Sequence, residues 1–514
     1  MPMLLRGAEL LRKHSIATAL RSMAGYTALS GLRYKSTTAA TAPVGPSKSH
    51  SAASSGLRGS TVVSGDGQTH VTTLSNGLRV ASERSPGHFT AVGVYVDGGS
   101  RYEDKSTSGY AHLMDRLAFR SSERFSSAES MAMIEKLGGS IMSSSSRECI
   151  MYQAAVFPHD VPTALKLLAD TTLRPMILPE EVDELRVAVP WELQDVESKP
   201  DMFLPEKLHE VAFRTGTLGN PLLCPVSQLN AATPELLSAY HRRWYRPERI
   251  VVAAVGVDHE DLVRMCCENG FADLAPLYSP TSPAAGSSEV SLSEPSAKSW
   301  FNKILGASSN AHQTVAPGGR SMLLGGGGSF SAGGPGKGMY SRLYTRVLNQ
   351  HAWIESCAAF HHCYADSGLF GISASCRPRN EHALLDVIAT ELEAVALGRP
   401  AASSRTSSRR PYTAHDGLST LEVRRAKNQL KSNLLMNLES RMVQLEDLGR
   451  QVQVSGHKVP ADTMIERIEA VTPQDISNAA KELLESPATL VAQGYVDGIK
   501  QFYPQIATNH KITI

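Results

Sequence analysis

The sequence predicts an α+β fold in two similar half-domains, each a mostly antiparallel sheet with helices packed on it. The first observation is length, because 514 residues exceed the roughly 250 to 300 that one hydrophobic core usually serves. The second is that strand-like and helix-like patterns alternate over residues 66–275 and return over residues 321–500. The third is composition, since more than half of residues 279–320 are Ser, Ala, Gly or Pro. Such a stretch is typical of a linker, which we place at residues 276–320.

The amino-terminal domain, residues 66–275, begins with a hairpin. Two short runs, His70–Leu74 and Leu78–Ser82, flank the turn residues Ser75-Asn76-Gly77. Periodicity predicts the other elements: strands at 91–96, 149–157 and 250–256, helices at about 107–120, 126–137, 159–173, 180–197, 202–214 and 233–245, and a short helix after Asp258.

The carboxy-terminal domain, residues 321–500, shows the same mixture of patterns. Helical periodicity and β-rich runs predict helices at about 338–350, 380–397 and 419–447, and strands near 354–363, 368–376 and 488–495. Residues 399–416 contain several serines and arginines, so we expect a loop insertion there.

The two ends of the chain are predicted to lie outside the domains. Residues 1–65 have a net charge of +7, whereas the remainder carries 43 basic and 49 acidic side chains. A leading segment rich in Arg, Ser, Ala and Leu is typical of a mitochondrial transit peptide, which we assign to residues 1–35. A merely disordered basic tail is the alternative. Residues 36–65 are expected to form a disordered arm, and residues 501–514 a tail.

Composition excludes several classes of protein. Apolar residues make up 42% and charged residues 20%, which is typical of a globular chain. No run of 18 uncharged apolar residues occurs, so no membrane-spanning segment is predicted. The seven cysteines include an adjacent pair and no CxxC, which argues against a disulfide framework and a zinc ribbon. No nucleic-acid partner is expected.

The helix at about 107–120 carries a degenerate zinc motif. Zinc peptidases of the inverted kind need His-x-x-Glu-His, in which two histidines bind the metal and the glutamate activates water. Here His112 holds the first position, Asp115 replaces the glutamate, and Arg116 replaces the second histidine. A guanidinium has no free lone pair for zinc. Glu192 stands where a third ligand is expected, and we predict an ion pair of Arg116 with Glu192 or Asp115 in place of the metal.

A second motif is the glycine-rich stretch 325–338, in which eight of the fourteen residues are glycine. No regular element is expected there, and the backbone can approach another chain closely. A phosphate-binding loop is excluded because Gly338, rather than Ser or Thr, follows Lys337. A disordered linker is the alternative, but a well-patterned helix follows the stretch.

These motifs together resemble the alpha subunits of the mitochondrial processing peptidases, a branch of the inverted-motif zinc peptidases. Leu324–Gln350 looks like their glycine-rich loop, His112–Phe119 like their degenerate zinc motif, and Arg425–Leu430 with Leu438–Gln451 like their carboxy-terminal helices. The resemblance covers about 66–275 and 321–500. It implies half-domains of the processing-peptidase type, no catalysis and no cofactor in this chain by itself, and a zinc-bearing beta subunit as its partner in a heterodimer.

The resemblance also implies a role in the mitochondrial matrix. In this family the beta subunit removes amino-terminal presequences from imported precursor proteins, while the alpha loop contacts or gates the substrate. The substrate-binding residues carried over are Gly325, Gly326, Gly327, Gly328, Ser329, Phe330, Ser331, Gly333, Gly334 and Lys337.

Presequences carry arginines, whose natural partners are carboxylates. The helices from about 419 to 451 supply several acids, among which we favour Glu422, Glu446 and Asp447 as presequence-binding residues. The competing interpretation is an ordinary solvated acidic surface.

Two other functions remain open from sequence. One is a structural core subunit of the ubiquinol cytochrome c reductase, with respiratory complex subunits as partners; the other is an active zinc peptidase, against which Arg116 argues. The chain also departs from the family upstream of the glycine stretch. Members carry a strand and a helix there, whereas residues 279–320 have only linker composition, so the second sheet is expected to lack a strand. Either the protein tolerates this loss, or residues 276–320 are an anomalous segment that comes from incorrect splicing or translation of the gene.

Overall fold

The amino-terminal domain is built on a seven-stranded sheet in the computed structural model, which describes residues 60–63, 69–214, 216–275, 323–328, 339–397, 418–485 and 488–494. The strands follow the order β1-β2-β3-β7-β4-β6-β5. Every neighbouring pair is antiparallel except β3 with β7. The strands are β1 (Ser60–Val63), β2 (Thr69–Thr73), β3 (Arg79–Glu83), β4 (Thr90–Val96), β5 (Ser140–Ser145), β6 (Ile150–Val156) and β7 (Ile250–Val255).

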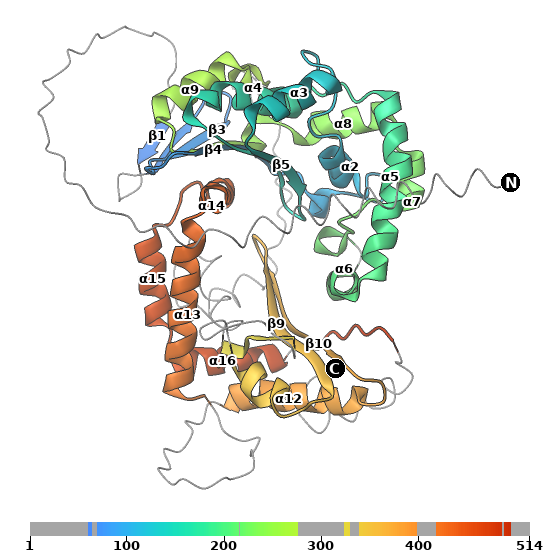
Figure 1. Cartoon of the computed structure of the whole chain (residues 1–514), viewed down its shortest axis with the longest axis vertical. Coiled ribbons are helices and arrows are strands. Elements are labelled where there is room, and N and C mark those ends of the chain that lie inside the picture. The colour runs from blue at the N-terminus through green and yellow to red at the C-terminus, as the bar shows by residue number, and fades with distance from the viewer. Residues whose placement is uncertain are drawn as a thin grey trace, which may run out of the picture. The chain divides into compact units, whose positions relative to one another are not determined.

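Helices cover this sheet and form much of the chain that connects its strands (Figure 1). They are α2 (Tyr110–Arg116), α3 (Ser127–Leu137), α4 (Val161–Leu173), α5 (Pro179–Ser198), α6 (Pro200–Phe213), α7 (Val226–Ala231), α8 (Pro234–Trp244) and α9 (His259–Glu268). Short 3-10 helices occur at Ser100–Tyr102, Pro158–Asp160, Thr217–Gly219, Pro247–Arg249 and Phe271–Asp273.

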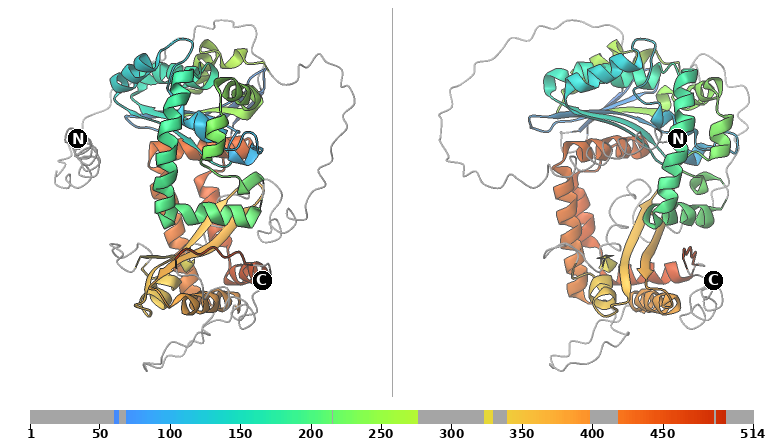
Figure 2. Two further views of the ribbon diagram at one scale, coloured as in Figure 1. Left: turned by 90° about the vertical axis from the view of Figure 1, so that its right-hand side faces the viewer. Right: turned by 45° about the vertical axis from the view of Figure 1, so that its right-hand side comes forward.

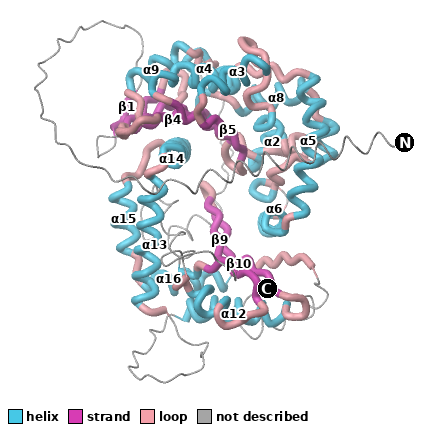
Figure 3. The backbone as a smooth tube through the Cα atoms, viewed as in Figure 1, coloured by secondary structure: helices cyan, strands magenta, loops and turns pink. Residues whose placement is uncertain are grey.

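The carboxy-terminal domain has a smaller sheet in the order β10-β9-β8. Its strands, magenta in Figure 3, are antiparallel: β8 (Gly326–Gly328), β9 (Ile354–Cys363) and β10 (Gly368–Cys376). The helices are a π-helical turn η7 (Leu343–Leu348), α12 (Glu381–Leu397), α13 (Thr420–Leu438), α14 (Arg441–Ser455), α15 (Ala461–Ala470) and α16 (Pro473–Glu485). Thus the α+β fold with mostly antiparallel sheets is confirmed in both domains.

Successive side chains of each strand point to opposite faces of the large sheet, and both faces are buried. On β4, Val92 and Val94 point into a core shared with α4 and α9. Tyr95 points to the opposite face and packs with Leu445 and Leu448 of α14. Figures 1 and 2 show α4 and α9 over one face and α14 under the other. The sheet of the first domain therefore completes its second core with a helix from the second domain.

Polar contacts fix α14 on this face. The Arg79 guanidinium donates to the Val452 carbonyl at 2.7 Å. Lys458, which follows α14 and is almost fully buried, lies 2.5 Å from a Glu83 carboxylate oxygen. Gly449 is required for the approach, because a Cβ there would lie 2.2 Å from the Tyr95 ring.

The tip of the β9–β10 hairpin makes a second contact with the first domain. The Asp366 carboxylate pairs with Arg101 at 2.5 Å, and the Ala365 amide donates to Glu148 at 3.0 Å. The Tyr364 hydroxyl lies 2.6 Å from Nε2 of His209 on α6. Burial lowers the pKa of His209 to about 4, so this joint holds a neutral imidazole at physiological pH.

Several elements differ from the sequence-based expectations. The Ser75-Asn76-Gly77 hairpin is present, but the serine-rich strand β5 was not predicted and α15 and α16 were missed. The helix expected at 419–447 is two helices, because the chain breaks at Glu439–Ser440 between α13 and α14. The strand expected near 488–495 is wrong for residues 488–494, which have no regular structure. Strand β1 lies within the range assigned to a disordered arm, where pairing with β2 stabilises it.

The described residues all belong to one unit, Leu57–Ile514. The expected transit peptide, most of the arm, the linker, most of the insertion at 399–416 and the tail at 501–514 lie outside the described residues. Among the described helices, none is long and apolar enough to cross a membrane.

Candidate functional site

The degenerate zinc motif lies on α2, a short helix that is buried along most of its length. The Glu103 carboxylate accepts hydrogen bonds from the backbone amides of Gly109 and Ala111, both at 2.6 Å. Burial raises the pKa of Glu103 to about 7, and these two donors oppose the rise. Gly109 has φ +83°, and a Cβ there would lie 2.2 Å from Cα of Cys224. Helix α2 is thus anchored tightly at its first turn.

His112 and Arg116 point from α2 toward Glu192 on α5. Nε2 of His112 lies 3.1 Å from Oε2 of Glu192. The Cys224 amide donates to Nδ1 of His112 at 3.3 Å, which places the imidazole proton on Nε2, facing the carboxylate. Burial, and then the neighbouring Arg116, lower the pKa of His112, so the ring is neutral near pH 7.

Arg116 takes the place of the cation that the motif normally binds. Its Nε lies 3.0 Å from Oε1 of Glu192, and Nη1 lies 3.7 Å from Oδ2 of Asp115. The predicted ion pair is therefore present and includes both carboxylates. Asp115 is buried, and its Oδ1 has no hydrogen-bond partner among the described residues.

The residues present do not fit a zinc ion. Zinc needs three or four side chains with free lone pairs, and the second ligand position here is the guanidinium of Arg116. Across the described ranges, no group of three His, Cys, Asp or Glu side chains is placed to hold a metal. The arrangement joins two helices by charge.

The first residues of the glycine-rich stretch form part of the second sheet. Gly326–Gly328 is strand β8, paired with Ser356–Ala358 of β9. Gly326 has φ +104°, and a Cβ there would lie 1.9 Å from the Cys357 carbonyl oxygen. The expectation that no regular element forms here is wrong for these residues, because glycine allows a contact that no side chain would permit. Six candidates lie outside the described residues: Ser329, Phe330, Ser331, Gly333, Gly334 and Lys337.

The chain that follows the glycine-rich stretch is fixed by a buried charge network. Arg342 is almost fully buried and lies 3.4 Å from Glu391 and 3.8 Å from Glu422. Arg346 lies 3.4 Å from Glu422. Sequence reasoning missed Arg342 and Glu391. The available signal was the spacing of Arg342 and Arg346, four positions apart beside an apolar helix face.

The three predicted presequence-binding acids do not form one cluster in contact with one another. Glu422, on α13, is paired with Arg346 and also caps its helix together with Ser419. Glu446, on α14, lies 3.2 Å from Arg450, and 39% of its side chain is exposed. Asp447 lies 3.5 Å from the buried Lys458, and only 20% of its side chain is exposed. Glu446 is therefore the acid that a ligand reaches most easily.

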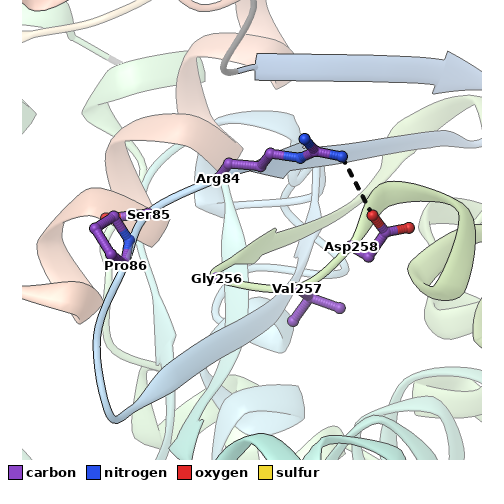
Figure 4. Close-up of a pocket in the computed structure, with 6 residues that line it drawn as sticks. All are labelled: Arg84, Ser85, Pro86, Gly256, Val257 and Asp258. Atoms are coloured by element: carbon purple, nitrogen blue, oxygen red, sulfur yellow. Dashed lines mark hydrogen bonds and ion pairs between the residues drawn. The ribbon is translucent and has the colours of Figure 1, made fainter. Parts of the chain in front are cut away.

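A hollow of about 410 Å³ lies where the parallel strands β3 and β7 end. Its lining, drawn in Figure 4, consists of Arg84, Ser85, Pro86, Gly256, Val257 and Asp258. Arg84 and Asp258 form an ion pair at 3.4 Å along one side. None of the predicted site residues lines it, and we assign it no role.

Comparison with known proteins places the chain in a family. Residues 79–226 match the family described as Insulinase (Peptidase family M16), and residues 231–403 match the Peptidase M16 inactive domain. A protease from Helicobacter pylori has the same fold, with a TM-score of 0.64 over 81% of this chain and 96% of that one, at 17% identity.

Relatives of higher identity cover most of the chain. The mitochondrial-processing peptidase subunit alpha of Neurospora crassa is 41% identical, over 83% of this chain and 84% of its own length. The probable subunit alpha of Schizosaccharomyces pombe is 41% identical, covering 80% and 81%, and the human subunit alpha is 36% identical, covering 83% and 82%. The chain therefore belongs to peptidase family M16 and, within it, to the alpha subunits of the mitochondrial processing peptidases.

Proposed function

We propose that the chain is the non-catalytic, substrate-recognising subunit of a processing peptidase in the mitochondrial matrix. A zinc-bearing beta subunit is its partner and removes presequences from imported precursors. The observation that carries the proposal is Arg116, which occupies the second zinc-ligand position and binds Glu192 at 3.0 Å. The relatives carry the processing-peptidase name, so a structural role in the ubiquinol cytochrome c reductase is not favoured.

The glycine-rich stretch is proposed to contact the substrate through Gly325–Gly328, Ser329, Phe330, Ser331, Gly333, Gly334 and Lys337. Support comes from the described residues at its two ends. The Gly326 amide donates to the Ser341 hydroxyl at 3.1 Å, so the chain leaves and returns at nearly the same point. Arg342 then fixes the returning end in the core. A loop whose two ends are fixed in the protein can place the residues between them where they contact a ligand.

We propose that Glu422, Glu446 and Asp447 bind presequence arginines, and that they differ in how easily each exchanges its present partner for a substrate arginine. Glu446 stands first because its partner Arg450 is on the same helix and 47% exposed, so a substrate arginine can replace it at little cost. Asp447 and Glu422 stand behind it, since each is paired with a buried or partly buried cation. Freeing either acid breaks an ion pair to a cation that is at least partly buried, which costs more than breaking the exposed pair of Glu446.

Processing by the assembled complex tests the proposal. The chain alone should cleave no precursor, the chain together with the beta subunit should cleave a presequence-bearing precursor, and a chelator should abolish this activity. The Asp115→Asn variant should process at the unchanged rate, because Asp115 has no catalytic task here. Precursor cleavage by the isolated chain, or a large loss of rate in the Asp115→Asn complex, would contradict the proposal.

A further inference from the structure

Helix α5 carries a solvent-facing apolar pair that the fold does not use. Trp191 is 70% exposed and Val187 is 68% exposed, the two highest values among the exposed large apolar side chains of the described residues. They stand four positions apart and so lie on the same face of the helix. Tryptophan is usually buried to a large extent, and an exposed one is typical of binding surfaces.

Acidic side chains extend this face in both directions. Glu184 and Asp195 flank the pair by one helical turn on either side, and their side chains are 61% and 59% exposed. Asp183, 67% exposed, lies beside Glu184. From Glu184 to Asp195 the stripe is about 16 Å long at 1.5 Å per residue. We call these five residues the α5 stripe.

Each of the three stripe acids is paired with one cation, and helix α5 as a whole still carries more acids than cations. Over Pro179–Ser198 the sequence has seven acidic residues and one basic residue, Arg186. The cations that face the stripe are Arg186, which pairs with Asp183, Arg120, which pairs with Glu184 at 3.0 Å, and Lys199, which pairs with Asp195. All three pairs are partly or largely exposed and so are weak and exchangeable.

The stripe lies on a different side of α5 from the degenerate site. Glu192 turns toward His112 and Arg116 of α2, and its side chain is 33% exposed. Trp191, the preceding residue, points about 100° away around the helix. The two features are therefore independent, and the ion pair at Glu192 can persist while the stripe is occupied.

Apolar residues on a helix with an excess of acids, whose ion pairs are exposed, select a ligand with the opposite pattern, namely an apolar face bordered by basic side chains. The leading residues of this chain illustrate that pattern, with Leu4, Ala8 and Leu11 at helical spacing and five Arg or Lys residues against one Glu over residues 1–33. We infer that the α5 stripe binds the basic amphipathic segment of a presequence, outside the degenerate site and apart from the acids of α13 and α14.

This inference rests on the proposed function, and the experiment separates the two. The probe is a synthetic peptide of residues 1–33, compared with a peptide in which its five Arg and Lys residues are Gln. Its Kd for the complex with the beta subunit is measured by fluorescence anisotropy at low and high salt. The Val187→Ser/Trp191→Ser variant should raise the Kd about tenfold or more. The matched apolar control is Leu236→Ser, 48% exposed on α8, which should change nothing.

Charge is tested separately. The Asp183→Asn/Glu184→Gln/Asp195→Asn variant should weaken binding at low salt, and the difference should vanish at high salt. Its matched control neutralises three acids of α9, in the variant Glu260→Gln/Asp261→Asn/Glu268→Gln. The peptide without basic residues should bind weakly to every protein.

Each outcome has a fixed meaning. An unchanged Kd in both stripe variants overturns the inference, while the proposed function stands if the wild-type complex still processes precursors. Loss of the beta subunit from the Val187→Ser/Trp191→Ser variant during purification also overturns it, because the stripe is then a subunit interface. A wild-type complex that binds the peptide but processes nothing contradicts the proposed function alone.

Discussion

Replacing Arg116 by histidine should restore zinc binding to the degenerate site. Two ligand atoms are already in position, since Nε2 of His112 and Oε2 of Glu192 lie 3.1 Å apart. Ligands on a tetrahedral zinc at bond lengths of about 2.0 to 2.1 Å are separated by about 3.3 Å. His112 is also neutral near pH 7, as a ligand must be, and its proton has to move from Nε2 to Nδ1 before Nε2 can bind the metal. A histidine at position 116 completes a set of two histidines and one glutamate.

The energies favour the metal-bound variant. The substitution removes the pair with Glu192, whose side chains are 42% and 33% exposed and which contributes roughly 0.5 to 1 kcal/mol. It also removes the longer pair with the buried Asp115 at 3.7 Å. Zinc at 100 times its Kd then contributes about 2.7 kcal/mol. At about 2 to 4 °C per kcal/mol for a domain of this size, zinc should raise the melting temperature of the variant by about 5 °C or more.

Elemental analysis and thermal unfolding provide the assay. The Arg116→His protein should hold one zinc per chain, whereas wild type and the Arg116→Gln control should hold none. Adding Glu192→Gln to the histidine variant should abolish binding. Zinc in purified wild type at one per chain, or a folded Arg116→His protein that binds none, would refute the reasoning. The variant should remain inactive, because Asp115 is one methylene shorter than the catalytic glutamate.

Three further predictions concern stability and can be measured by denaturant or thermal unfolding. Gly449→Ala should cost about 1 to 3 kcal/mol of unfolding free energy by overpacking, because its Cβ would lie 2.2 Å from the Tyr95 ring; an unchanged urea midpoint would contradict the α14 contact. Deleting residues 325–334 should destabilise the second sheet by removing β8, whereas deleting 329–334 should not. Because the folded-state pKa of His209 is about 4 and the unfolded value is about 6.5, the unfolded chain takes up the proton first. Stability should therefore fall as pH drops from about 6.5 toward 4, and His209→Gln should reduce this dependence, to which His241, whose pKa is also lowered to about 4 by burial, contributes as well.

Much of the fold followed from local pattern. Helices with a clear apolar face, such as α4 and α9, were expected nearly where they occur, because their stripes repeat every 3.6 residues. Strand β5 was missed because Ser140–Ser145 is mostly serine. As an edge strand it pairs only with β6, so pairing and not side-chain burial defines it. Sequence periodicity cannot predict such a strand, because its side chains show no apolar pattern.

The sites divide in the same way. His112, Asp115, Arg116 and Glu192 were recognised because the motif has fixed spacing on one helix, and the ion pair follows from the chemistry of arginine. The buried charges of Arg342, Glu391 and Glu422 come from three separate segments. Their meeting depends on tertiary packing, which no local pattern encodes. For the same reason the sequence suggested that Glu422 is a surface acid available to substrate, although it forms ion pairs with Arg342 and Arg346.

The placement of α14 sets the order in which the protein can fold. During synthesis the strands of the large sheet emerge within the first 255 residues, but the helix that covers their second face begins only at Arg441. Until that helix has been synthesised and packs on the sheet, Ala91, Tyr95 and Val251 remain exposed to water. A nascent or truncated chain thus presents a long-lived apolar sheet face, which makes it aggregation-prone and a client for chaperones. Fragments that end before residue 441 should consequently be insoluble even though they contain the complete sheet.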